Sequence, residues 1–348
     1  MKLGFSYWGY CENYNISEIV ETPDGGRFTR PILVKELLKN EVEVIALQKQ
    51  RETNPLIGLK FSDAFPKIDC LFIEFRWSTY KNDKTHINFI KDKYESDLDR
   101  QRELLNFYCG KIPIIIWDTD LKATKDDIVK YKNDVIFAEP ALKCINKIAL
   151  SMLYFTDYNI ELFDVREPKR QITYVGSNYE RYWGVDKYYY NIGELYRLAN
   201  IDINFYGSWL TKSIERPEQE EQIKKYSKFI NFHKRNKFLE GMKILNNSLC
   251  TIHIVKKQYC EVGLITPRFF ESLASNTIAF VPEEFLIQPY GDVFKANTLN
   301  TFDKINSIGS ISKIERENII NDQKNYMQNA YPQTKVENFV KRMIDLFS

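Results

Sequence analysis

The sequence has few of the residues from which metal centres and disulfide frameworks are built. Its 348 residues include three histidines, and none stands at ligand spacing from another histidine or a cysteine. Structural zinc sites need compact sets of nitrogen and sulfur ligands, so we expect no such site. The six cysteines are scattered without a C-x-x-C pair, a pattern typical of reduced thiols in a cytosolic protein.

Net charge and long apolar runs are also lacking. The formal net charge is +2, which gives no strong overall attraction to nucleic acid, although a local basic surface stays open. No apolar run approaches the ~18 residues of a membrane span. The first residues enter a strand pattern without the apolar core of a signal peptide. We therefore expect a soluble, cytoplasmic protein with no membrane partner.

The glycine-rich fingerprint of dinucleotide-binding proteins is missing as well. The first strand pattern, residues 2–7, is followed by Gly9, but the segment lacks the G-x-G start of that fingerprint. An enzyme that uses NAD is therefore not expected.

Apolar periodicity predicts the fold class. The apolar fraction of 44% and the chain length are ample for two cores. Short apolar runs at 2–7, 42–47, 70–75, 112–117 and 135–137, and again at 172–175, 203–206, 250–255 and 278–281, alternate with helical patterns at 31–40, 84–108, 186–199, 238–246 and from Pro267 onward. Two further helices are expected at 314–329 and 335–347. This alternation predicts an α/β protein with two Rossmann-like parallel-sheet domains, 1–168 and 169–330, facing across a cleft, and a C-terminal segment 331–348.

The segment 264–275, LITPRFFESLAS, is the most informative stretch. Pro267 suits a first helical turn, and the apolar residues behind it fall at helical spacing. Arg268 and Glu271 then lie near the start of this helix, where anions are favoured and a guanidinium fits phosphate oxygens. Glu271 can accept hydrogen bonds from ribose hydroxyls. The pattern favours half of a nucleotide-sugar site, and the alternative is an ion pair on a packed helix.

Two aspartates, Asp118 and Asp120, end the apolar run at 112–117. Carboxylates at the carboxyl end of a parallel strand point toward the usual ligand site of such sheets. The D-x-D spacing suits a divalent metal on a nucleotide diphosphate, or one aspartate acting as general base toward an acceptor hydroxyl. The third interpretation is an aspartate that caps the following turn.

The turn at Gly176 and Ser177 closes the first strand of the second half. Glycine lets the backbone approach a phosphate closely, and the serine hydroxyl and amide can donate hydrogen bonds. A purely structural turn is the alternative meaning.

The order of these motifs resembles the DNA β-glucosyltransferases of T-even phages, within the GT-B class of glycosyltransferases. The matching segments are MKLGFSYWG at 1–9, IIWDTDL at 115–121, YVGS at 174–177, INFYG at 203–207, and ITPRFFESLAS at 265–275 through EEF at 283–285. The resemblance implies that Asp120 is the catalytic base, that Arg268 binds the diphosphate and that Glu271 binds the ribose. The family's second diphosphate arginine has Arg181 as its nearest candidate. The family's N-domain glutamate near the donor sugar aligns near Thr29 and Arg30.

The same resemblance implies an activity. We expect an inverting glycosyltransferase that moves a sugar, glucose from UDP-glucose first of all, onto a hydroxymethylated pyrimidine of double-stranded DNA after flipping the base. Gly176, Ser177, Arg181, Arg268 and Glu271 would bind the donor, with Mg²⁺ or Mn²⁺ as an optional aid. The expected protein is a monomer of the host cytoplasm whose last helix packs on the N-terminal domain. The candidates for DNA phosphate contacts are Arg27, Arg30, Lys49, Arg51 and Arg76.

Two rival functions stay open. One is a GT-B transferase acting on a cell-surface glycan, polyol or protein. The other is a nucleotide- or DNA-binding protein of this fold without turnover.

Overall fold

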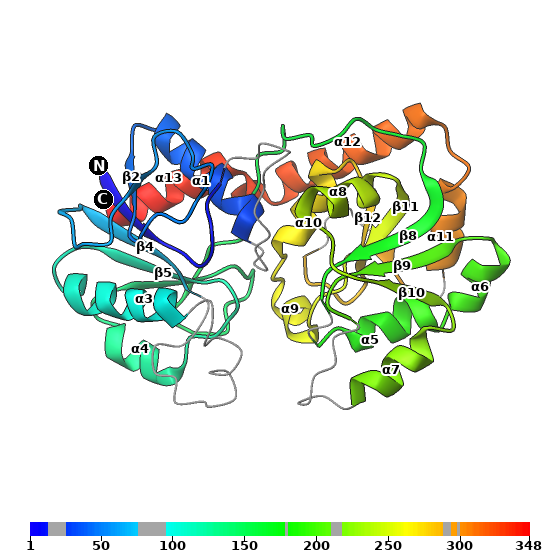
Figure 1. Cartoon of the computed structure of the whole chain (residues 1–348), viewed down its shortest axis with the longest axis horizontal. Helices are drawn as coiled ribbons and strands as arrows, with labels where there is room; N and C mark the ends of the chain where they lie inside the picture. The colour runs from blue at the N-terminus through cyan, green and yellow to red at the C-terminus, as the bar shows by residue number, and fades with distance from the viewer. Residues whose placement is uncertain (13–25, 76–94, 178–179, 210–217, 288–293, 298–299) are drawn as a thin grey trace. The chain divides into compact units, whose positions relative to one another are not determined.

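The computed structural model describes residues 1–12, 26–75, 95–177, 180–209, 218–287, 294–297 and 300–348 (Figure 1). The chain divides into two compact units. Unit 1 comprises Met1–Thr156 and Gln333–Ser348, and unit 2 comprises Asp157–Pro332. Each unit contains one parallel sheet with helices, so the predicted α/β class is confirmed. Within the described residues, no helix combines the length and the apolar character needed to cross a membrane.

Unit 1 is built on a seven-stranded parallel sheet in the order β3-β2-β1-β4-β5-β6-β7. Its central strands are fully buried, because they read as continuous apolar runs that need cover on both faces. Figure 1 shows α1 and α13 on one side of this sheet and α3 and α4 on the other. The bounds are β1 Lys2–Ser6, α1 Gly26–Lys39, β2 Glu43–Ala46, β3 Lys60–Phe61, β4 Cys70–Phe75, α3 Glu95–Tyr108, β5 Ile114–Asp118, α4 Lys125–Tyr131, β6 Ile136–Glu139, β7 Leu150–Ser151 and α13 Val336–Phe347.

The last helix, α13, contributes to the core of unit 1. The Phe339 ring lies 4.2 Å from the ring of Phe155 and 5.3 Å from that of Trp117, measured between centroids. The backbone amide of Val336 also donates to the carbonyl of Thr156. The end of the chain is therefore anchored by both apolar packing and backbone hydrogen bonds.

Unit 2 has a six-stranded parallel sheet in the order β10-β9-β8-β11-β12-β13. Its helices include α8 and α10, which Figure 1 shows together beside the strands. The bounds are β8 Lys169–Val175, α5 Tyr182–Val185, a π-helical turn Asp186–Tyr190, α6 Gly193–Leu198, β9 Asp202–Tyr206, α7 Glu218–Tyr226, β10 Ile230–His233, α8 Phe238–Asn246, β11 Ser248–Ile252, α9 Lys257–Val262, α10 Pro267–Ala274, β12 Ala279–Pro282, β13 Lys295–Ala296, α11 Thr301–Ile308 and α12 Lys313–Ala330.

Two predicted helices differ from the structure. Helix α1 begins at Gly26 and not at the expected position 31, because Phe28 and Arg30 find buried contacts that extend the helix before its proline. The single helix expected at 186–199 is a π-helical turn followed by the short α6. The helix expected at 84–108 is described only from Glu95, and residues 76–94 lie outside the described part of the chain.

Candidate functional site

In unit 2, the carboxyl end of β8 carries the Gly176–Ser177 turn. The turn is held by its neighbours: the amide of Gly176 donates to Tyr206 at 2.9 Å, and Trp209 Nε1 donates to the Gly176 carbonyl at 2.7 Å. Gly207 has a φ of 151°, and a Cβ there would lie 2.0 Å from the Gly176 carbonyl oxygen. Only glycine permits this approach of two backbones. The turn therefore has a fixed place at the edge where parallel sheets bind ligands.

One arginine contacts this turn, and a second acts on the same histidine as the first. Arg181 Nη1 donates to the carbonyl of Ser177. Its buried Nε has no hydrogen-bond partner among the described residues. Arg268 and Arg181 both act on His253, since the positive charges of the two lower its pKa. Arg181, which contacts the Gly176–Ser177 turn, and Arg268 therefore both lie within electrostatic reach of His253, where the two guanidinium groups form a local positive field suited to an anion.

Helix α10 positions Arg268 and Glu271. Pro267 is its first residue, and Phe269, Phe270 and Leu273 are buried, which confirms the predicted helix and its apolar face. Arg268 Nη1 donates to Glu271 Oε2 at 2.6 Å. The Arg268 side chain is 31% exposed whereas that of Glu271 is 2% exposed. The expected alternative, an i,i+3 ion pair, is therefore present, and it leaves part of the guanidinium accessible to a ligand.

His253 completes this group and was not predicted as a site residue. It follows β11 directly, and its side chain lies against the ring edges of Phe269 and Phe285, at centroid distances of 5.6 and 6.5 Å. Burial first, and then the charges of the two arginines, lower its pKa from 6.5 to about 3. The imidazole is therefore neutral at physiological pH. The only signal in the sequence was a histidine at the end of an apolar strand.

In unit 1, Asp118 and Asp120 follow β5 but lie in different surroundings. Asp118 is buried, and its carboxylate accepts from the amides of Lys122 at 2.8 Å and Ala123 at 2.7 Å. Burial raises the pKa of Asp118 to about 7, although these two amides oppose the shift. Asp120 is partly exposed and is followed by Leu121 in the left-handed region, with a φ of 55°. Asp118 thus caps the turn, which leaves Asp120 as the more accessible carboxylate.

These two aspartates do not form a metal site by themselves. Each oxygen of Asp118 accepts a hydrogen bond from a backbone amide, one from Lys122 and the other from Ala123. Across the described ranges, no group of three or more His, Cys, Asp and Glu side chains is gathered around a point that could hold a metal ion. We therefore derive no step through Mg²⁺ or Mn²⁺.

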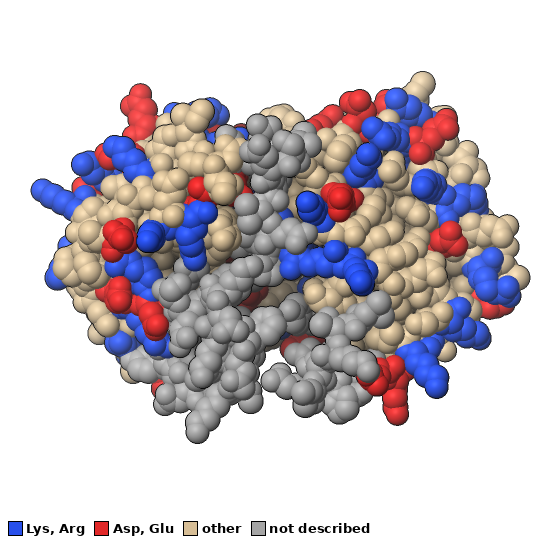
Figure 2. All heavy atoms as spheres, viewed as in Figure 1, with Lys and Arg blue, Asp and Glu red and all other residues tan. Residues whose placement is uncertain are grey.

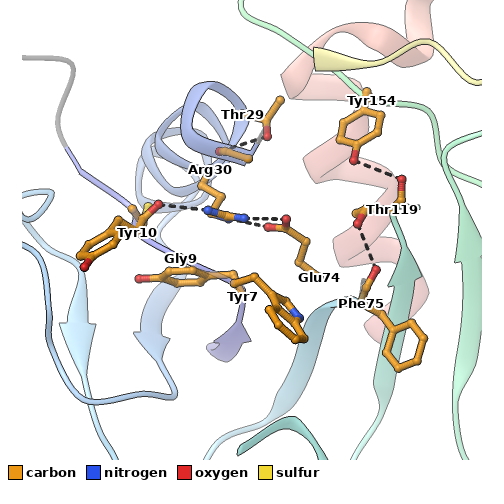
Figure 3. A network of polar contacts seen from close by, with 12 residues as sticks. Tyr7, Gly9, Tyr10, Thr29, Arg30, Glu74, Phe75, Thr119 and Tyr154 are labelled. Atoms are coloured by element: carbon orange, nitrogen blue, oxygen red, sulfur yellow. Dashed lines mark hydrogen bonds and ion pairs between the residues drawn. The ribbon is translucent and has the colours of Figure 1, made fainter. Parts of the chain in front are cut away.

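A buried polar network lies at the same edge of the unit 1 sheet (Figure 3). Arg30 on α1 makes a two-pronged pair with Glu74 on β4, at 2.5 Å from Nε and 2.7 Å from Nη2. Its Nη1 donates to the carbonyl of Tyr10 at 3.1 Å, and its guanidinium lies 5.2 Å from the centre of the Tyr7 ring. Arg30 is 1% exposed. The structure therefore gives Arg30 an internal partner, and we drop it as a candidate for DNA phosphate contacts.

The other candidates for DNA contacts have mixed surroundings. Lys49 is exposed, and Arg27 is partly exposed on α1. Arg51 donates to the carbonyl of Gly9 at 3.1 Å and lies over the Tyr10 ring. Arg76 lies outside the described residues. Figure 2 shows positive and negative side chains interspersed on the visible surface, which agrees with the small net charge.

No protein-family model and no curated protein matches the sequence. Solved structures do match the fold along nearly its whole length. An alpha-glucosyltransferase in complex with UDP and a 13-mer DNA containing an A:G mismatch has a TM-score of 0.64 and 10% identity, over 99% of this chain and 98% of that one. The glycosyltransferase AviGT4 of avilamycin A biosynthesis has a TM-score of 0.56 and 10% identity, over 99% and 96%. A UDP-forming alpha,alpha-trehalose-phosphate synthase from Burkholderia xenovorans, in complex with glucose-6-phosphate, has a TM-score of 0.56 and 9% identity, over all of both chains.

These matches define the class of fold. Two parallel-sheet units of seven and six strands, matched along the whole chain by glycosyltransferases, are the GT-B fold. The predicted fold class is therefore confirmed. At identities of about a tenth, the likeness extends to the fold and not to the reaction.

Proposed function

We propose that the protein is a glycosyltransferase that takes its sugar from a UDP-sugar. The observation that carries this proposal is the group in unit 2 formed by the Gly176–Ser177 turn, Arg181 and Arg268 around a neutral histidine. Two arginines, one with a buried donor that has no partner among the described residues, suit a diphosphate far better than a neutral ligand. The alpha-glucosyltransferases that share the fold were solved with UDP, which supports a uridine nucleotide.

Each donor-binding residue then has a role. Arg268 and Arg181 stabilise the negative charge that grows on UDP as the bond to the sugar breaks, and the start of α10 adds its dipole. Gly176 and Ser177 bring backbone and hydroxyl donors close to the phosphates. We assign Glu271 to the ribose hydroxyls, because the motif resemblance places the family's ribose-binding glutamate at this position and its carboxylate lies beside Arg268, at 2.6 Å.

We further propose that the acceptor is a hydroxymethylated pyrimidine in DNA. The support is the DNA in the complex of the similar alpha-glucosyltransferase and the motif resemblance that includes Asp120. In this scheme Asp120 removes the proton of the acceptor hydroxyl, whose oxygen bonds to the anomeric carbon while the carbon–oxygen bond to UDP breaks and UDP keeps the electron pair. The expected donor is UDP-glucose.

The test is incubation with UDP-glucose and duplexes that contain hydroxymethylcytosine, hydroxymethyluracil or only unmodified bases, followed by mass analysis of the nucleosides. A hexose on one modified nucleoside supports the proposal. Release of glucose or its transfer to another acceptor, with all three DNAs unchanged, would overturn the DNA assignment and keep the enzyme. Tight UDP binding with no turnover of UDP-glucose would indicate a binding protein.

Substitution of the aspartates tests the mechanism. We expect Asp120→Asn to lower the rate of transfer by about 10²–10⁴-fold, the usual contribution of a general base, with UDP affinity within a few-fold of the parent. Asp118→Asn is the matched control two residues away, and it should lower the rate far less. Equal losses of UDP affinity for both variants, seen only with Mg²⁺ or Mn²⁺, would instead indicate a metal site.

A second stereochemical outcome is favoured by a specific observation. Base catalysis by Asp120 inverts the anomeric centre, whereas the similar solved structures carry the name alpha-glucosyltransferase. Since UDP-glucose is itself α-linked, an α product would mean retention. Proton NMR of the glucosylated nucleoside distinguishes the two: a β linkage supports the role of Asp120 as base, and an α linkage argues against it.

The second candidate for the acceptor is a small molecule. The similar structures from avilamycin and trehalose-phosphate synthesis favour it.

A further inference from the structure

The side chain of Thr266, the N-cap residue of α10, does not make the hydrogen bond that is usual for its position. Thr266 stands at the N-cap with φ −94° and ψ 160°, the extended backbone from which a threonine hydroxyl normally accepts from the second or third amide of the helix. Among the described residues, however, its side chain makes no such capping bond. The amide end of α10 is therefore not covered by its own N-cap hydroxyl.

The hydroxyl is engaged elsewhere. Thr266 Oγ1 lies 3.3 Å from Nε2 of His253, so the two side chains form a hydrogen bond across the space between β11 and α10. The backbone of His253 is held by its amide, which donates to the carbonyl of Phe280 at 2.7 Å, and the imidazole has T-shaped contacts with the rings of Phe269 and Phe285. His253 is 4% exposed. The direction of the Thr266 hydroxyl is thus set by a fixed partner.

Charge explains why a histidine suits this place. A cationic side chain here would add a third positive charge beside Arg181 and Arg268, and a carboxylate would neutralise them. A buried imidazole whose pKa is lowered to about 3 stays neutral, so it offers a hydrogen bond without changing the charge of the site.

We propose that His253 is a positioning residue that holds the Thr266 hydroxyl away from the amides of α10 and so keeps the start of this helix open to the diphosphate of the donor. The inference rests on the proposed function, because it assumes that a nucleotide diphosphate binds at Arg181 and Arg268. Without His253, the hydroxyl turns to its usual capping position and competes with phosphate oxygens for the same amides.

The experiment is a comparison of UDP and uridine binding to four proteins: the parent, His253→Phe, Thr266→Val, and the double variant. A capping bond is worth about tenfold in an equilibrium constant, so His253→Phe should bind UDP about tenfold more weakly. Thr266→Val has no hydroxyl to compete and should bind UDP like the parent. The double variant should regain most of the affinity that His253→Phe loses, which a damaged fold could not do.

Uridine separates a local effect on phosphate from a general effect on the site. Its binding, measured by ligand-observed NMR, should be the same in all four proteins because it has no phosphate. An equal loss of UDP and uridine in His253→Phe, or a double variant as weak as His253→Phe, would overturn the inference. If Arg268→Ala weakens UDP binding while His253→Phe leaves it unchanged, this inference fails and the proposed function stands. If the parent binds no UDP, both fail.

Discussion

Two arginine–glutamate pairs, one in each unit, show how the same two residue types serve different ends. Arg30 and Glu74 are both buried, meet through two hydrogen bonds, and come from segments 44 residues apart. Arg268 and Glu271 lie three residues apart on α10 and meet through one hydrogen bond, and the arginine is 31% exposed. In unit 1 the glutamate accepts two hydrogen bonds from the arginine and balances its charge. In unit 2 the buried glutamate holds an arginine whose other donors stay available to a ligand.

The largest effect is expected at the pair in unit 1. Glu74→Ala leaves the guanidinium of Arg30 buried without its counter-charge, and breaking a buried pair in this way typically costs about 3–5 kcal/mol. The double variant Arg30→Met/Glu74→Leu removes both charges and should recover most of that loss. Chemical denaturation of the three proteins measures the free energy of unfolding of unit 1. A loss below about 1 kcal/mol for Glu74→Ala would mean that Arg30 reaches water or another partner.

At the pair in unit 2, the effect should fall on binding. Arg268→Ala removes a charge-assisted contact to the diphosphate, which is worth about 1.5–3 kcal/mol, so UDP affinity should fall about 10- to 100-fold. The melting temperature should also fall, because the buried carboxylate of Glu271 loses the guanidinium that donates to it, but by less than for Glu74→Ala, since the Arg268 side chain is 31% exposed. Isothermal titration with UDP measures the first effect and calorimetry the second. Unchanged affinity for UDP would refute the assignment of the nucleotide site.

Glu271 gives a second test of the pair in unit 2, because we assign its carboxylate both to Arg268 and to the ligand. Glu271→Ala should weaken UDP by about tenfold and pyrophosphate by less, because we assign its carboxylate to the ribose. Competition experiments with the two ligands on the same protein give the ratio directly. Equal losses for both ligands would mean that Glu271 acts only by holding Arg268.

The contrast between the pairs also shows what the sequence could predict. The apolar runs of β4 and β5 and the proline and phenylalanine spacing of α10 depend on neighbours in the chain, and these elements were confirmed. The pairing of Arg30 with Glu74 depends on how α1 packs on the sheet, and no local pattern marks it, so the sequence alone predicts a surface position for Arg30. The sequence does not mark His253 as a site residue for the same reason. Its low pKa depends partly on two arginines that lie 72 and 15 positions away in the sequence.

The smallest effect per measured step is a pair of opposite pH dependences, one in each unit. The pKa of His253 is lowered from 6.5 to about 3 in the folded protein. Between these two pH values the histidine is protonated in the unfolded chain and neutral in the folded protein. Its contribution to stability is fully present above pH ~6.5 and is lost as the pH falls toward 3, with a slope of about 1 kcal/mol per pH unit.

The pKa of Asp118 is raised to about 7, so here the folded protein holds a proton that the unfolded chain has released. The contribution of Asp118 to stability is present below pH ~4 and is lost as the pH rises toward 7.

His253→Phe should therefore flatten the acid side of the stability profile of unit 2, and Asp118→Asn should remove a decline in the stability of unit 1 between pH 4 and 7. Calorimetry at half-unit steps from pH 4 to 8 measures both slopes, and matching profiles for the parent and both variants would show that neither group titrates outside its ordinary range.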